Sequence, residues 1–153
     1  MSDSISPSPR PARASLPALS DFQHVREDRL RLTDLDFQQH VNNAAQTALL
    51  ANARFDFLGE VVRPALPPGD KLVIASLEVS FVREMLYGDA VFTGTRILSI
   101  GRTSLRLEQA IYQAGQCALR AVSVFVHVSA ADKAAAPWPA AVRALSQAHS
   151  SHQ

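Results

Sequence analysis

Carboxylates, a histidine and two asparagines gather in one short stretch of the chain, between Thr33 and Asn43. The acids are Asp34 and Asp36, and the imidazole is that of His40. Carboxylates and imidazoles are the side chains that most often act as nucleophile or general base. A helical pattern begins directly after the stretch, and the first turn of a helix leaves backbone N–H groups unpaired. Together these groups could attack a bound carbonyl and stabilise the oxyanion that results.

The chemistry suggested is the hydrolysis of an ester or thioester whose carbonyl lies at the start of the helix. A carboxylate would attack it directly or activate a water. The same residues also have a plainer explanation, because Asp and Asn often precede helices and hydrogen-bond to nearby backbone groups. From spacing alone, helix capping is the better explanation, and a structural role is the more usual one for His40.

A helix is expected directly after this segment. Asn42 or Asn43 is the expected N-cap and Gly59 fits the C-terminal end. The alanine-rich composition predicts that the helix is buried on most of its sides. Apolar residues recur at three- and four-residue steps, namely Ala44, Ala45, Ala48, Leu49, Leu50, Ala53, Phe57 and Leu58.

The rest of the chain is predicted to form strands. One strand is expected within residues 22–33, and about four follow the proline-rich loop 63–70, within 71–84, 90–100, 105–111 and 121–128. The last strand alternates, with valines on one face and His127 among the residues of the other.

One helix facing one antiparallel sheet is an α+β architecture. A single helix covers only one face of the sheet, so a partner subunit is expected to protect the rest. A short helix is predicted over residues 140–148.

Composition excludes several classes of function. The chain has 153 residues and a formal net charge of +1, which gives no electrostatic case for binding nucleic acid or a membrane surface. The single cysteine, Cys117, cannot form an internal disulfide and fits a cytoplasmic location. No spacing of Cys and His indicates a metal site, and no glycine-rich phosphate loop is present.

The domain organisation is simple. Residues 1–20 are rich in proline, serine and alanine and are predicted to be a disordered N-terminal tail. A transit peptide is the alternative, but Asp3 and the prolines break its amphipathic pattern. Residues 21–148 are predicted to form a single domain, which is long enough to bury a core.

Several segments resemble one known family. Thr33-Asp34-Leu35-Asp36 followed by His40-Val41-Asn42-Asn43 resembles the S-D-T-D-x-x-G-H-V-N-N signature of hotdog-fold acyl-CoA thioesterases of the 4-hydroxybenzoyl-CoA thioesterase-like group. Leu77–Arg83 looks like the strand after the family's helix, Leu86–Asp89 like its L-x-G-D turn, and Ile100–Leu105 like its G-R-S-S turn. The resemblance covers residues 24–145.

The resemblance implies a hotdog fold, in which an antiparallel sheet wraps one long central helix, and a dimer or a dimer of dimers. It implies an acyl-CoA or acyl carrier thioester as substrate, bound at the dimer interface, with coenzyme A as part of the substrate and no separate cofactor. By position, Asp36 matches the catalytic carboxylate, and Asn43 matches the residue whose backbone N–H holds the thioester oxygen. His40 belongs to the same motif and is the third catalytic candidate, while Asp34 is expected to be supporting or structural. The turn that contacts the CoA nucleotide in some members matches Arg102, Thr103 and Ser104.

Three positions depart from the family pattern. Gln39 replaces the glycine before the histidine, Gln46 replaces a common tyrosine, and Glu84 replaces a proline. These departures leave open an alternative, a non-catalytic hotdog protein that binds acyl thioesters. A hotdog dehydratase or hydratase has less support, because Asp56 lies too far along the helical pattern to serve as the central-helix acid of such enzymes.

Overall fold

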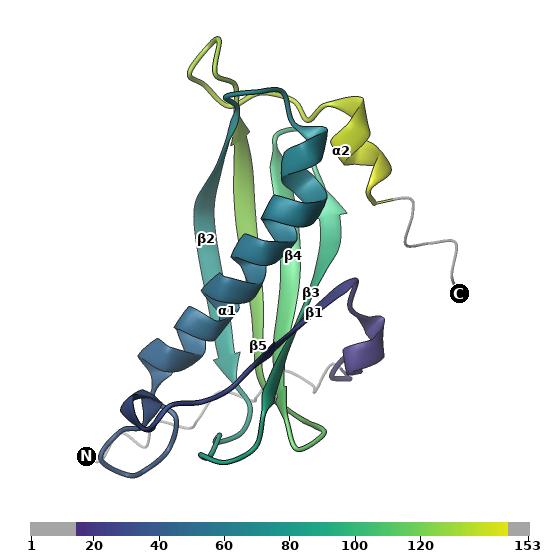
Figure 1. Cartoon of the computed structure of the whole chain (residues 1–153). Coiled ribbons are helices and arrows are strands. Elements are labelled where there is room, and N and C mark those ends of the chain that lie inside the picture. Colours follow the sequence, from purple (N-terminus) through teal and green to yellow (C-terminus); the bar gives the residue numbers. More distant parts are fainter. Residues whose placement is uncertain (1–14, 147–153) are drawn as a thin grey trace, which may run out of the picture.

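The computed structural model describes residues 15–146, in which one long helix lies across a five-stranded antiparallel sheet (Figure 1). This confirms the predicted α+β architecture. Within residues 15–146, no helix is long and apolar enough to cross a membrane. The long helix is α1 (Asn43–Phe57), and a short helix, α2 (Ala140–Ala144), lies near the C-terminus. The strands are β1 (His24–Asp28), β2 (Lys71–Phe81), β3 (Val91–Ile100), β4 (Ser104–Gln113) and β5 (Gln116–Val128), in the spatial order β1-β3-β4-β5-β2.

The ends of α1 differ in part from the prediction. Asn42 is the N-cap, and its side-chain oxygen accepts a hydrogen bond from the backbone N–H of Ala45 at 2.7 Å. The α-helix ends at Phe57, and Gly59 lies inside a π-helical turn, Leu58–Val62, rather than after the last turn. A 3-10 turn then occupies Arg63–Ala65, at the start of the proline-rich loop.

Most strand ends lie close to their predicted positions, but β5 begins at Gln116, five residues before the predicted start. Two other differences bear on the acidic segment and its surroundings. The first strand, β1, ends at Asp28, and a 3-10 turn at Leu32–Asp34 leads into the acidic segment. At the end of β2, the N–H groups of Val82 and Arg83 both converge on the carbonyl of Ala118, so the chain bends away from the sheet. The acidic segment is therefore a loop between β1 and α1. The helix predicted over 140–148 ends at Ala144, and 147–148 lie outside the described residues.

The core between α1 and the sheet has two apolar clusters. One surrounds the start of α1 and includes Leu50, Met85 and Ile111, and the other surrounds its end and includes Phe57 and Trp138. Strand β5 alternates as predicted, with buried residues such as His127 toward the helix and half-buried valines on the other face.

Polar side chains separate the two apolar clusters beneath α1. The guanidinium of Arg54 donates to Gln109 Oε1 at 2.9 Å, and Gln109 Nε2 donates to the carbonyl of Leu50 and to Thr95 Oγ1. Burial lowers the pKa of Arg54. Because buried polar groups must be paired, this network fixes how α1 sits along the sheet.

The outer side of α1 is open in the single chain. Ala44, Ala48 and Ala51 are exposed, and the side chain of Phe55 is 80% exposed. The expectation that the helix is buried on most sides is therefore not met within one protomer.

Residues 15–22 pack on the sheet face opposite α1. The Tyr112 hydroxyl donates to the carbonyl of Pro17, and the ring of Phe22 contacts Tyr112 edge-on with centroids 6.3 Å apart. The guanidinium of Arg96 lies 5.1 Å from the centroid of the Phe22 ring. The predicted disordered tail therefore extends too far, since residues 15–20 are ordered against the sheet, while 1–14 lie outside the described residues.

Glycine at position 94 is needed for this packing. A Cβ atom there would lie 2.4 Å from Phe22 Cγ. We expect Gly94→Ala to displace the Phe22 ring and to lower the free energy of unfolding by about 2 kcal/mol, measured by urea denaturation. Adding Gly94→Ala to a Phe22→Ala protein should cost much less, because the ring is already absent. A Gly94→Ala protein as stable as the unchanged protein would contradict this.

Candidate active site

Asp36 closes a tight loop before α1. Its backbone N–H donates to the carbonyl of His40 at 2.8 Å, and its Oδ1 accepts from the N–H groups of Gln38 at 2.9 Å and His40 at 3.1 Å. No hydrogen bond joins Oδ2 to any residue in the described part of the chain. One carboxylate oxygen therefore holds the loop, and the other is free to react.

The neighbouring acid has a different role. Asp34 Oδ2 accepts from the backbone N–H of Arg31 at 2.7 Å, which closes the 3-10 turn. The Asp34 carbonyl accepts from both the backbone N–H and the side-chain amide of Asn42, at 2.8 and 2.9 Å. Since Asn42 also caps α1, it ties the acidic loop to the helix. These contacts support a structural role for Asp34.

Asn43, the first residue of α1, lines the same cavity as Asp36. The backbone N–H groups of Asn43 and Ala44 have no acceptor among residues 15–146, as expected in the first turn of a helix. A cavity of about 320 Å³ brings together three predicted site residues, Asp36, His40 and Asn43. Its other lining residues are Gln38, Val41, Gln46, Phe81, Val82, Arg83 and Glu84.

His40 lies at the edge of this cavity. Its Nε2 is 3.4 Å from a carboxylate oxygen of Glu84, the residue that stands where the family pattern has proline. Glu84 was noted in the sequence only as a departure, and Arg83 was not predicted to belong to this site. No local pattern marks them as site residues, because it is the bend after β2 that brings them to the start of α1.

Gln46 lines the cavity from the first turn of α1. Its side chain is 5% exposed, and Nε2 donates to the carbonyl of Val41 at 2.8 Å. Its Oε1 is buried without a hydrogen-bond donor in the described part of the chain. The glutamine thus holds the peptide just before the N-cap, within the segment that joins Asp36 to the helix.

Gln39 adopts a backbone conformation that favours glycine. Its φ is +63°, in the left-handed region, which explains why the family signature has glycine at this position.

Replacing Gln39 with glycine should therefore stabilise the protein. A left-handed conformation costs a non-glycine residue about 1–2 kcal/mol, part of which glycine recovers. We expect Gln39→Gly to raise the free energy of unfolding by about 0.5–1 kcal/mol, measured by urea denaturation. The matched control is Gln38→Gly, at a position without positive φ, which should be destabilising. A loss of stability in Gln39→Gly as large as in Gln38→Gly would show that the left-handed conformation is not strained.

The proposed CoA-binding residues lie elsewhere in the single chain. Arg102, Thr103 and Ser104 form the turn from β3 to β4, held where Gly101 N donates to the Ser104 carbonyl at 2.8 Å. β1, which leads to Asp36, pairs with the opposite end of β3. A strand of 10 residues spans roughly 30 Å, so one protomer does not bring this turn to the Asp36 cavity.

Comparison with known proteins adds independent information. A family model described as the thioesterase-like superfamily matches residues 30–145. A search of curated proteins found no significant match. Among solved structures, a thioesterase from Thermus thermophilus, complexed with coenzyme A and Zn, is 30% identical with a TM-score of 0.70, and the alignment covers 81% of this chain and 97% of that one.

Two further structures are similar. A predicted thioesterase from Bacillus stearothermophilus is 26% identical with a TM-score of 0.72, over 82% of this chain and 94% of that one. A 1,4-dihydroxy-2-naphthoyl-CoA thioesterase from Synechocystis is 18% identical with a TM-score of 0.64, over 80% and 96%, which supports the fold alone. The chain belongs to the thioesterase-like superfamily, and its single long helix on a five-stranded antiparallel sheet is the hotdog fold of these thioesterases.

Proposed function

We propose that the protein hydrolyses acyl-CoA thioesters, with Asp36 as nucleophile or general base. The observation that carries this proposal is the state of the Asp36 carboxylate. Oδ1 is fixed by two backbone N–H groups, Oδ2 has no hydrogen-bond partner in the described part of the chain, and Asp36 lines a cavity together with Asn43, at the start of α1. The similar thioesterase complexed with coenzyme A supports a CoA thioester as the substrate class.

The reaction needs only groups that meet at this cavity. The thioester carbonyl would lie against the backbone N–H of Asn43, where the helix dipole and the unpaired amide stabilise the developing oxyanion. Asp36 would attack the carbonyl carbon, or remove a proton from a water that attacks it. By the first route, the new carbon–oxygen bond joins Asp36 to the acyl carbon as the carbon–sulfur bond breaks, and a water then hydrolyses the resulting anhydride. By the second route, the oxygen of the water forms the new bond directly as the carbon–sulfur bond breaks. One water is consumed on either route and one of its protons ends on the sulfur, so the products are a carboxylate and the free thiol of coenzyme A.

A second copy of the chain would complete the substrate site. β2 lies at an edge of the sheet and has exposed apolar side chains, among them Val73 at 48% and Ile74 at 45%. Antiparallel pairing of β2 with its counterpart would satisfy this edge. In this pairing, the start of the partner's β2 would lie beside Phe81, which lines the cavity. The start of β2 is at the same end of the sheet as the turn of Arg102, Thr103 and Ser104. The pairing would therefore bring the partner's turn toward the Asp36 cavity. We therefore place the CoA nucleotide at that turn, in a dimer or tetramer. A cytoplasmic location stays a prediction.

The proposal is tested by incubating the purified protein with short-chain, long-chain and aromatic acyl-CoAs and acyl carrier proteins. Release of free thiol is followed with DTNB, and the oligomeric state is measured by light scattering. We expect thiol release from at least one acyl-CoA by a dimer or tetramer. Binding of acyl-CoA in calorimetry without thiol release would instead favour the non-catalytic binder, to which the substitutions at Gln39 and Gln46 point.

A further inference from the structure

We propose that Gln113, the last residue of β4, is a positioning residue for thioester hydrolysis. Its side chain holds the segment Arg83–Asp89, whose first two residues, Arg83 and Glu84, line the Asp36 cavity. The catalytic consequence rests on the proposed function, whereas the structural part of the proposal can be tested without it.

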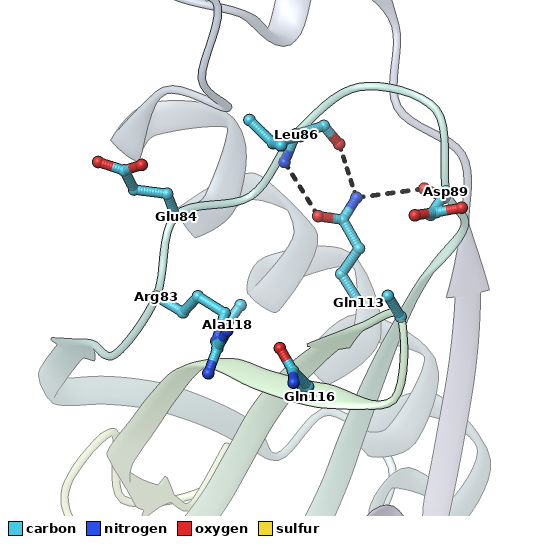
Figure 2. Close-up of a pocket in the computed structure, with 8 residues that line it drawn as sticks. Arg83, Glu84, Leu86, Asp89, Gln113, Gln116 and Ala118 are labelled. Atoms are coloured by element: carbon cyan, nitrogen blue, oxygen red, sulfur yellow. Dashed lines mark hydrogen bonds between the residues drawn. The ribbon is translucent and has the colours of Figure 1, made fainter.

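The side chain of Gln113 bonds to this segment at three points (Figure 2). Its Oε1 accepts from the backbone N–H of Leu86 at 3.0 Å, and its Nε2 donates to the carbonyls of Leu86 at 2.7 Å and Asp89 at 3.3 Å. One carboxamide thus pairs with both backbone groups of Leu86. A peptide unit of a neighbouring β-strand would make the same two bonds.

The other side of the segment contacts the catalytic loop. Leu86 forms an antiparallel bridge with His40, and the N–H of Val41 donates to the carbonyl of Met85 at 2.9 Å. Successive residues of an extended chain direct their backbone groups to opposite sides. Met85 therefore bonds toward the catalytic loop, and Leu86 bonds away from it, toward Gln113.

The space behind the segment explains why it needs to be held. A second cavity, of about 460 Å³, lies between the segment and the turn from β4 to β5. Arg83 and Glu84 line both this cavity and the Asp36 cavity, so they stand between two open spaces. Without the bonds to Gln113, the segment has room to move away from His40 and Val41. Because Val41 is held by Met85 and directly precedes the N-cap, such a movement would shift the carboxylate relative to the start of α1.

The test compares Gln113→Met with Gln116→Met. Both residues line the second cavity. In both variants the carboxamide is removed, while the volume of the side chain changes little. The side chain of Gln116 makes no hydrogen bond to any residue in the described part of the chain, so the control isolates the three bonds of Gln113. Hydrogen–deuterium exchange of the full-length protein reports the position of the segment, and DTNB kinetics report kcat and KM.

We expect Gln113→Met to speed amide exchange in residues 39–42 and 84–90 by about tenfold, because the loss of the three hydrogen bonds makes local opening of the segment easier. It should lower kcat by about 10- to 100-fold with KM changed less than about threefold, since misplaced catalytic groups act mainly on the chemical step. Gln116→Met should leave both unchanged. Gln113→Glu, which puts a carboxylate oxygen in place of the donor to the carbonyls of Leu86 and Asp89, should disturb the segment at least as much as Gln113→Met.

Unchanged exchange and kcat in Gln113→Met would overturn the proposal, as would equal effects of the two methionine variants. Faster exchange throughout the sheet in both Gln113 variants would assign Gln113 to general stability and overturn the positioning role. If the unchanged protein releases no thiol from any substrate, the proposed function fails. The exchange comparison then still decides whether Gln113 holds the segment.

Discussion

Replacing Asp36 with asparagine is expected to lower kcat by about a thousandfold or more, because the variant has no carboxylate to attack the thioester or to accept a proton. Asparagine keeps an Oδ1 that can accept from the N–H groups of Gln38 and His40, so the loop should retain its shape. The measurement is DTNB-monitored turnover of the best acyl-CoA, together with the melting temperature and the oligomeric state. Asp36→Ala should be equally inactive and also less stable, since it loses both loop contacts.

The neighbouring acid provides the matched control for this experiment. Asp34→Asn makes the same chemical change two positions away, and an asparagine oxygen can still accept from the N–H of Arg31. We expect kcat within about threefold of the unchanged protein, because this residue only shapes the turn before the catalytic loop. If Asp36→Asn hydrolyses acyl-CoA at the unchanged rate, or if Asp34→Asn is the inactive variant, the assignment of the catalytic carboxylate is wrong.

The main elements were predictable because they depend on local periodicity. The three- and four-residue spacing of apolar residues defined α1, and alternation defined β4 and β5. The start of α1 followed from the capping chemistry of Asn42. The end was less predictable, because a π-helical turn at Leu58–Val62 continues the helical path beyond the last α-helical residue.

The catalytic candidates were predictable only because they lie in one short motif. Asp36, His40 and Asn43 share a loop and the following helix start, so local sequence places them together. Glu84 and Gln113 reach the same region through the bend after β2 and through strand pairing, which local sequence does not specify. The packing of residues 15–20 on the sheet was hidden for a similar reason, since it depends on the space that Gly94 leaves for Phe22.

The largest loss of stability is expected at the far end of α1, where Asp70 and His127 form a buried pair. His127 Nε2 lies 2.6 Å from Asp70 Oδ2, and Nδ1 lies 3.1 and 3.0 Å from the carbonyls of Ala136 and Pro137. Two carbonyl acceptors require a hydrogen on Nδ1, so the ring donates to the C-terminal segment on one side and faces the carboxylate on the other. The ring of Trp138 stacks on the imidazole, with centroids 5.0 Å apart. The pair therefore fastens the C-terminal segment over the end of the core.

We expect His127→Leu to lower the melting temperature by about 10 °C or more, because it leaves the Asp70 carboxylate buried without its partner. Limited proteolysis should then cut the C-terminal segment first. The control is His40→Leu, which removes an imidazole that lies 3.4 Å from an exposed carboxylate of Glu84 and should change the melting temperature by about 2 °C or less. Equal melting temperatures for the two variants would show that the buried pair does not hold the segment.

Lowering the pH tests the contribution of the Asp70 carboxylate to the same pair. The N–H of Ala130 and then the imidazole of His127 lower the pKa of Asp70 in the folded protein. A lowered pKa means that this carboxylate stabilises the fold above its unfolded pKa of about 3.9, and that the contribution is lost as the pH falls through the folded value. The melting temperature of the unchanged protein should therefore fall more steeply below about pH 4 than that of Asp70→Asn, which has no proton to take up at this site. If the melting temperatures of the two proteins fall in parallel as the pH is lowered, the charge of Asp70 does not stabilise the fold. The hydrogen bond that Asp70 accepts from the N–H of Ala130 would then be its only contribution.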